Sequence, residues 1–236
     1  AGEAEHHHNY VYHTWDRYFP NPDRRWGISD QRWKLMAQFG TDAEPDPSGW
    51  RLYDLESDPG ETTNVIKQQS EIAERLRAEF VRWFEDVTEG IDYQPIRIPV
   101  GDPREDPVEI EPSWATWEGD HIQYTFDGYD WDTIDSWKSP AETAKWQLDV
   151  KSAGSYRVSL SYGCRPLDAG GALRLSSGDS SIEHTVKATA TAEQYGVFEI
   201  GTLNLEAGEV ELIAEVIEAP GKELMQLNGI FLEKAD

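Results

Sequence analysis

The stretch Trp50–Asn64, W-R-L-Y-D-L-E-S-D-P-G-E-T-T-N, predicts a short strand, a tight turn and the approach to a helix. Apolar side chains fall on both faces of residues 50–55, which predicts a strand that is covered on both sides instead of solvated on one. Asp58-Pro59-Gly60 predicts the turn, because proline presets φ, glycine accepts a positive φ and aspartate bonds its own backbone.

The sequence pattern L-Y-D-L-x-x-D-P-G-E-x-x-N of residues 52–64 resembles a segment near the C-terminus of type I sulfatases, the formylglycine-dependent, arylsulfatase-like enzymes. Upstream, R-W-G-I-S-D-Q-R-W-K-L at Arg25–Leu35 resembles the strand pair that precedes it in that family. Downstream, the helix that ends in Phe80–Val87 is similar to the family's closing helix. The resemblance covers about residues 9–112 and is specific for the family, but it does not indicate the substrate.

This resemblance implies that the chain is the C-terminal portion of a sulfatase and that its partner is an N-terminal catalytic domain outside this sequence. The calcium and the formylglycine nucleophile of the family would lie in that domain, so this chain is expected to carry no cofactor and no metal and to be inactive alone. The chain begins Ala1-Gly2-Glu3-Ala4, without methionine, which favours a piece of a longer protein. Any export signal would then lie outside it, and we expect an extracellular or periplasmic location.

Composition limits the partners. The 236 residues contain 38% apolar side chains, enough for one large or two modest cores. The net charge of −24 argues against nucleic acid, because phosphate binding needs a basic surface. No apolar run is long enough to span a membrane, so we expect no membrane partner. The single cysteine, Cys164, excludes an internal disulfide framework and a cysteine-rich zinc site.

A basic stretch stands out within this acidic chain. Residues 17–34 contain five basic and two acidic residues, interleaved with tryptophans. Guanidinium groups bind tetrahedral oxyanions in a bidentate way, and aromatic faces stack on sugar or aryl rings. We therefore predict a site for a sulfated small molecule or glycan at His13, Trp15, Arg17 and Arg24, in the loop that the family resemblance places toward the active-site mouth. The alternative is that these arginines pair with nearby aspartates and with the catalytic domain.

The first 90 residues are predicted to form a small antiparallel sheet with a C-terminal helix. Asn9–His13 and Lys34–Phe39 predict strands, and Gly40–Gly49 predicts a polar connection. Ser70 is the predicted N-cap, and Gly90 the predicted stop, of a helix that packs one apolar face on the sheet. That face consists of Ile72, Leu76, Phe80, Trp83, Phe84 and Val87. Residues 91–113, with five prolines among charged residues, predict an extended linker.

In residues 114–236 the apolar period changes to two, which predicts an all-β sandwich, most simply a jelly roll. The complete fold class is therefore α+β. The eight predicted strands are Ile122–Phe126, Lys145–Val150, Tyr156–Tyr162, Ala172–Ser176, Glu183–Lys187, Val197–Ile200, Val210–Ile217 and Leu224–Leu232.

The words W-Q-L-D-V-x-x-A-G-S-Y-R-V-S-L-S-Y, L-x-L-E-A-G-E-V-E-L and L-N-G-I-F-L in this second domain resemble galactose-binding-like and carbohydrate-binding β-sandwich modules. Within it, the loop 127–137 carries the candidate site. Tyr129, Trp131 and Trp137 are predicted to stack on sugar rings. Asp130, Asp132 and Asp135 could bind sugar hydroxyls or calcium, although their spacing lacks the glycine and glutamate of an EF-hand. The alternative is that the loop packs aromatic side chains for structure alone.

Cys164-Arg165-Pro166-Leu167-Asp168 begins like the sulfatase nucleophile motif C-x-P-S-R, but leucine and aspartate replace its serine and arginine, so Cys164 is not predicted to be the nucleophile. His121 and His184 are isolated and receive no role. The leading hypothesis is thus the C-terminal fragment of a sulfatase for sulfated carbohydrates or aryl sulfates, in which this piece shapes the substrate pocket. The alternatives are a non-catalytic carbohydrate-binding or docking module and a purely structural one.

Overall fold

The computed structural model describes residues 9–15, 20–23, 25–37, 49–125 and 131–235. The chain divides into an N-terminal unit, residues 1–93, and a C-terminal unit, residues 94–236. Within the described residues, no helix is long and apolar enough to cross a membrane.

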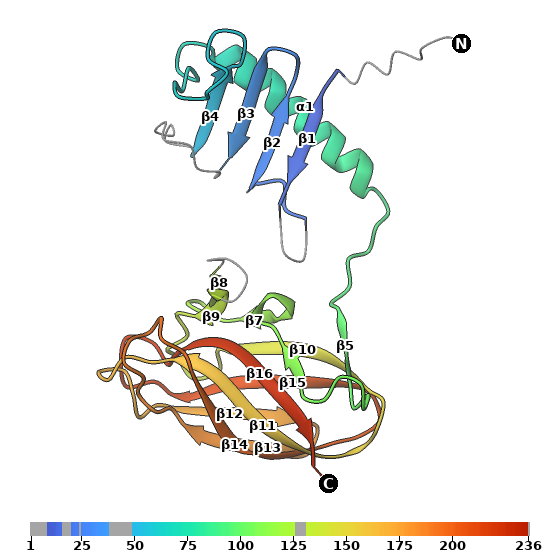
Figure 1. Cartoon of the computed structure of the whole chain (residues 1–236), viewed down its shortest axis with the longest axis vertical. Coiled ribbons are helices and arrows are strands. Elements are labelled where there is room, and N and C mark those ends of the chain that lie inside the picture. The colour runs from blue at the N-terminus through green and yellow to red at the C-terminus, as the bar shows by residue number, and fades with distance from the viewer. Residues whose placement is uncertain (1–8, 16–19, 24, 38–48, 126–130, 236) are drawn as a thin grey trace. The chain divides into compact units, whose positions relative to one another are not determined.

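The N-terminal unit is a four-stranded antiparallel sheet with one helix against one face, as predicted (Figure 1). The strands are adjacent in chain order, because each hairpin returns the chain beside the strand it has just left. Their bounds are β1 Val11–Thr14, β2 Trp26–Ser29, β3 Trp33–Ala37 and β4 Trp50–Asp54, and the helix is α1 Ser70–Thr88.

The core between sheet and helix is aromatic. Trp26, Leu52 and Phe80 are fully buried, and the Trp26 and Phe80 rings stack with centroids 4.7 Å apart. The opposite face of β4 is buried as well, since Tyr53 is fully buried and packs with Met36. The prediction that this strand is covered on both faces is therefore confirmed.

The turn after β4 differs from the prediction in one detail. The positive φ falls at Glu61 (55°), one residue after Gly60. Asp58 accepts the backbone N–H of Glu61 through its carbonyl and those of Thr62 and Thr63 through its carboxylate. The Glu61 carboxylate also pairs with Lys34 Nζ at 2.8 Å. This anchored turn holds glutamate in a conformation that glycine adopts more readily.

The two ends of α1 were predicted to within one residue. The N-cap is Gln69, without a side-chain capping bond, and Ser70 is the first helical residue. Assignments of helix ends commonly differ by a residue. Gly90 follows the C-cap with a φ of +73° and ends the helix as predicted.

The C-terminal unit is a β-sandwich of two sheets around one core (Figure 1). The first has the order β13-β12-β15-β10-β5, with β7 also paired to β10, and the second has the order β14-β11-β16-β9-β8, with β6 also paired to β16. The jelly-roll class stays a prediction. The strands that were predicted from alternation are β8 Gln123–Thr125, β10 Thr143–Val150, β11 Gly154–Gly163, β12 Ala172–Ser177, β13 Ser180–Thr185, β14 Gly196–Leu205, β15 Gly208–Glu218 and β16 Gln226–Lys234.

Four short strands and one 3₁₀ turn were not predicted. They are β5 Arg97–Val100, β6 Val108–Ile110, η1 Pro112–Trp114, β7 Thr116–Glu118 and β9 Thr133–Asp135. β5, β6 and η1 lie within or at the end of residues 91–113, so the prediction that this segment is only an extended linker is wrong. β5 pairs in parallel with β10, and β6 pairs with β16, so both belong to the sandwich. Pro99 is tolerated within β5 because this short strand has a neighbour, β10, on one side, so that a missing N–H on the other side disrupts no ladder.

Candidate functional site

The loop end of the sandwich, between β8 and β9, carries the candidate binding residues of the C-terminal unit. Trp131, the first described residue of the segment that leads into β9, is 62% exposed. Its carbonyl oxygen accepts the hydroxyl of Tyr195 at 3.4 Å. The next residue, Asp132, is buried and accepts the Tyr124 hydroxyl at 2.6 Å. The indole of Trp131 is therefore exposed to solvent, while its own carbonyl oxygen and the residue that follows it are hydrogen-bonded to the sandwich.

Polar contacts from three strands fix this segment. The Asn228 side-chain amide donates to the Asp132 carbonyl oxygen at 3.2 Å, and the Ser161 hydroxyl donates to the Asn228 side-chain oxygen at 3.0 Å. Asp135, also buried, accepts from Gln123 Nε2 at 3.1 Å. These carboxylates are thus engaged inside the protein. Over the described part of the chain, no three His, Cys, Asp or Glu side chains are grouped as a metal site.

The prediction that Trp137 stacks on a sugar ring is wrong. Its side chain is fully buried, and its indole Nε1–H donates to the Met225 carbonyl oxygen at 2.7 Å. A ring enclosed in the core cannot reach a sugar. Alternation within the loop did not reveal this, because Trp131 and Trp137 stand in similar polar surroundings in the sequence. Tyr129 and Asp130 lie outside the described residues.

Sequence reasoning missed further aromatic residues near this segment. Trp117 on β7 is 40% exposed, and its ring lies 6.2 Å from that of Tyr124 on β8. Tyr195, which contacts Trp131, lies before β14. Residues from such distant parts of the sequence meet because β7, β8 and the loop before β14 end in the same region, and no local pattern predicts that.

Glu142 organises the next loop of the same unit. Its side chain is 3% exposed, and its carboxylate accepts the backbone N–H groups of His121, Lys138 and Ser139 at 2.7–3.0 Å. Burial opposes its ionisation, but these three N–H donors together lower the pKa of Glu142 from 4.5 to about 2. His121 Nδ1 also contacts it at 2.9 Å. Both residues therefore have a structural role.

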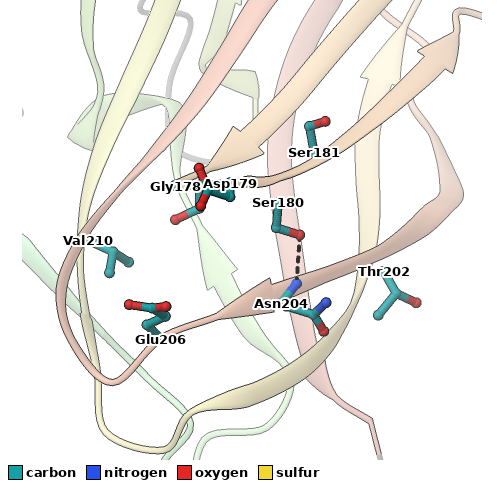
Figure 2. Close-up of a pocket in the computed structure, with 9 residues that line it drawn as sticks. Gly178, Asp179, Ser180, Ser181, Thr202, Asn204, Glu206 and Val210 are labelled. Atoms are coloured by element: carbon teal, nitrogen blue, oxygen red, sulfur yellow. Dashed lines mark hydrogen bonds between the residues drawn. The ribbon is translucent and has the colours of Figure 1, made fainter.

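A polar groove of about 680 Å³ lies at another part of the sandwich, beside the β12–β13 turn and the end of β14 (Figure 2). Asp179, Thr202 and Glu206 contribute oxygen atoms to it. The Ser180 hydroxyl accepts the Asn204 backbone N–H at 2.9 Å. None of the residues that line it is aromatic, so it offers hydrogen bonds without a stacking surface.

Of the four residues predicted to bind a sulfated substrate in the N-terminal unit, the structure describes His13 and Trp15. His13 on β1 and Trp15 directly after it lie at alternating positions, so both side chains point to the face away from α1. His13 is exposed, and Trp15 is 47% exposed. Arg17 and Arg24 lie outside the described residues. Arg32 and Lys34 follow the alternative interpretation, because they pair with Asp54 and Glu61.

Cys164 is 2% exposed, and burial raises the pKa of its thiol to about 11. A buried, protonated thiol is a poor nucleophile, so the sequence-based rejection of Cys164 as the sulfatase nucleophile agrees with its surroundings. His184 is buried beside the Tyr162 hydroxyl at 3.0 Å.

No protein-family model matches the chain, and no curated protein matches it. Among solved structures, a family 35 carbohydrate-binding module from Clostridium thermocellum is similar with 15% identity and a TM-score of 0.45, over 55% of this chain and 98% of that one. A module of Cellvibrio mixtus lichenase 5A in complex with cellotriose has 18% identity and a TM-score of 0.45, over 56% and 99% of the two chains. The insecticidal crystal protein Cry2Aa has 16% identity and a TM-score of 0.44, over 53% and 21%. Likenesses at this level assign no function, and none of these three is a sulfatase.

Proposed function

We propose that the C-terminal unit is a non-catalytic carbohydrate-binding module and that Trp131 is its stacking platform. The exposed indole of Trp131 carries this proposal, because 62% exposure of a tryptophan leaves a flat apolar surface in water. Hydrogen bonds from Tyr195 to the Trp131 carbonyl oxygen and from Tyr124 to Asp132 fix residues 131 and 132 before binding, which lowers the entropic cost of ordering them on a sugar ring. The resemblance of the sequence to carbohydrate-binding modules motivates the ligand class. A glycan ligand also agrees with a location outside the cytoplasm, which is part of this proposal.

Calorimetry on the full chain with soluble neutral and sulfated polysaccharides tests the proposal. We expect Trp131→Ala to weaken binding at least tenfold, a loss of about 1.4 kcal/mol, because it removes the aromatic face on which the sugar ring would stack. Trp15→Ala is the comparison variant, because it removes an exposed indole from the N-terminal unit, and its effect is read with the neutral polysaccharide, which carries no sulfate. Binding that survives Trp131→Ala and is lost in Trp15→Ala would contradict the proposal and favour the N-terminal unit.

As a second candidate, we propose that the N-terminal unit completes a type I sulfatase whose catalytic domain, with its calcium and formylglycine, lies in another polypeptide segment. One observation favours it: the three segments that resemble the family assemble into one unit. The Arg32–Asp54 and Lys34–Glu61 pairs join the first segment to the second. Phe80 of the third stacks on Trp26 of the first. In this role His13, Trp15, Arg17 and Arg24 would contact a sulfated substrate.

An aryl-sulfate assay distinguishes the two candidates. The chain alone should show no turnover, and activity that needs an added catalytic domain should fall when Arg17→Ala and Arg24→Ala raise KM for the anionic substrate. Turnover by the chain alone, or unchanged kinetics in both arginine variants, would contradict this second candidate. Neither result bears on Trp131, so the carbohydrate-binding proposal is tested separately.

A further inference from the structure

The two edges of the N-terminal sheet differ in how their backbone groups are satisfied. At β4, the groups that point away from β3 are bonded by the following segment. Leu52 O accepts the Val65 N–H at 2.9 Å, and Leu52 N–H donates to the Asn64 side-chain oxygen at 3.0 Å. The Asn64 amide donates to Trp50 O at 3.2 Å. This edge of the sheet is therefore closed.

The other edge is β1, whose register identifies its outward groups. Trp15 N–H donates to Arg25 O at 3.0 Å, and the register continues with His13 opposite Gly27 and Val11 opposite Ser29. In an antiparallel pair the bonded residues alternate, so Val11, His13 and Trp15 bond to β2. The N–H and C=O groups of Tyr12 and Thr14 then point away from the sheet. In the portion of the chain that the structure describes, no group bonds to them.

This edge also lacks the features by which proteins usually protect an exposed strand. Residues 11–14, V-Y-H-T, contain no lysine, no proline and no acidic residue. Their pairing with β2 has no bulge. Val11 is 51% exposed and Trp15 is 47% exposed, and both lie on the face away from α1, on either side of His13. Such a strand is a template for another strand.

We propose that β1 pairs with β1 of a second copy of this chain, antiparallel, about a two-fold axis that passes beside His13. Tyr12 would exchange both backbone hydrogen bonds with the partner's Thr14, and the symmetry repeats this exchange. His13 would face the partner's His13 as a close, non-bonded pair. The two sheets would join into one of eight strands, with both helices on the same side.

Self-complementarity argues for a second copy and for this register. Val11 falls opposite the partner's Trp15, and the symmetry produces the same pair a second time, so both exposed apolar side chains become covered. Pairs of a β-branched and an aromatic side chain are favourable across strands. A register centred on Tyr12 would instead place Trp15 opposite the partner's Asn9, which covers less apolar surface.

The contact involves a single short strand from each chain, so the dimer is expected to be weak. Each chain carries a net charge of −24, which opposes association. Added salt screens that repulsion, so the dimer should strengthen between low and moderate ionic strength.

Sedimentation equilibrium on the full chain tests the proposal. Val11→Lys places a charge on the edge and should weaken association at least tenfold. Leu167→Lys, the same charge at a loop position that is 92% exposed, should leave it unchanged. Thr14→Pro removes an outward N–H and spares the bonds to β2, so it should also yield monomers. Circular dichroism and thermal melting establish that each variant is folded.

A mixing experiment tests the two-fold axis itself. His13→Glu and His13→Lys each place like charges opposite each other and should give monomers, whereas an equimolar mixture of the two should associate as a heterodimer. A wild-type chain that stays monomeric at high concentration and moderate salt would overturn the proposal. So would a dimer that survives Val11→Lys and both His13 variants, because its interface would lie elsewhere.

Discussion

In the N-terminal unit, the polar residues of the sulfatase-like motif bind backbone of the adjoining strand and turn. In the C-terminal unit, the buried acidic residues that hold the loops belong to no motif and bind parts of the sandwich farther away in the sequence. Asp58 binds backbone N–H groups four and five residues ahead and closes a turn, and Asn64 binds the strand just before that turn, 12 and 14 residues back, and closes a sheet edge. The Asp132 carbonyl oxygen instead accepts from Asn228, 96 residues away, and the Glu142 carboxylate accepts the N–H of His121, 21 residues away. Motif residues in the first unit thus indicate a local structure, while the second unit depends on contacts that no motif shows.

This difference can be tested first with the two tryptophans of the sandwich loop. Trp137→Ala should lower the free energy of unfolding by about 3–5 kcal/mol, because it leaves a large cavity and loses the bond to Met225. Trp131→Ala should change it by less than about 0.5 kcal/mol, since that ring is largely in water. Urea denaturation measures both. Equal losses in the two variants would contradict the distinction between a core and a surface tryptophan.

The second test removes the anchor of a sandwich loop. Glu142→Gln should cost about 1–3 kcal/mol, because an amide NH₂ replaces one acceptor oxygen facing buried N–H donors. Glu118→Gln is the control, since Glu118 forms an exposed pair with Lys145 and such pairs contribute about 0–1 kcal/mol. Urea denaturation at neutral pH compares the two.

Glu142 also predicts a pH dependence. Its pKa is lower in the folded chain, about 2, than its ordinary 4.5, so its stabilisation is fully present above pH 4.5 and is lost as the pH falls toward 2. The stability of the wild type should therefore fall more steeply with acid than that of Glu142→Gln. If the free energy of unfolding fell equally with pH in the two proteins, the three backbone N–H donors would not be keeping the Glu142 carboxylate ionised.

The third test opens the closed edge of the N-terminal sheet. Asn64→Ala removes the acceptor of the Leu52 and Ile66 N–H groups and the donor to Trp50 O, and should cost about 1–2 kcal/mol. Gln68→Ala, at an exposed position of the same segment, should be nearly neutral. If β4 then behaves like β1, the Asn64 variant should also associate more strongly in sedimentation experiments. A neutral Asn64→Ala would show that this edge does not need its side-chain cap.

The smallest expected effect is at the end of α1. Gly90→Ala should cost about 1 kcal/mol, because a φ of +73° is unfavourable for alanine. Gly60→Ala is the matched control, since Gly60 does not have such a φ and the nearest atom to an added Cβ lies 3.5 Å away. Thermal melting of the two variants measures the difference. A larger loss at Gly60 would contradict the turn geometry, in which Glu61 has the positive φ.

Much of the fold could be predicted because the responsible forces are local. The alternation of residues 145–150 or 210–217 reflects two faces of a strand, and the apolar face of residues 72–87 reflects one side of a helix. The prediction of a linker at residues 91–113 was wrong because many prolines show only that a segment lacks backbone N–H donors. The pairing of β5 with β10 depends instead on a strand about fifty residues away.

The candidate site was predictable to a smaller extent. The loop 127–137 was found from its aromatic and acidic composition, and in its described part, residues 131–137, Trp131 is exposed whereas Trp137 belongs to the core. Tyr195 and Trp117 were missed because nothing in their own neighbourhoods marks them. For Arg32 and Lys34, the paired alternative agrees with the observed contacts to Asp54 and Glu61.

The sequence by itself determined the two units, the turn after β4, the end of α1 and most of the sandwich strands, because hydrophobic periodicity and turn chemistry act over a few residues. Only the tertiary structure decided that Trp137 is buried while Trp131 is exposed, that Pro99 lies in a strand and that the β4 edge of the first sheet is closed. Burial and edge pairing depend on contacts between residues that are far apart in the chain, and a local sequence pattern does not show which distant residues come together.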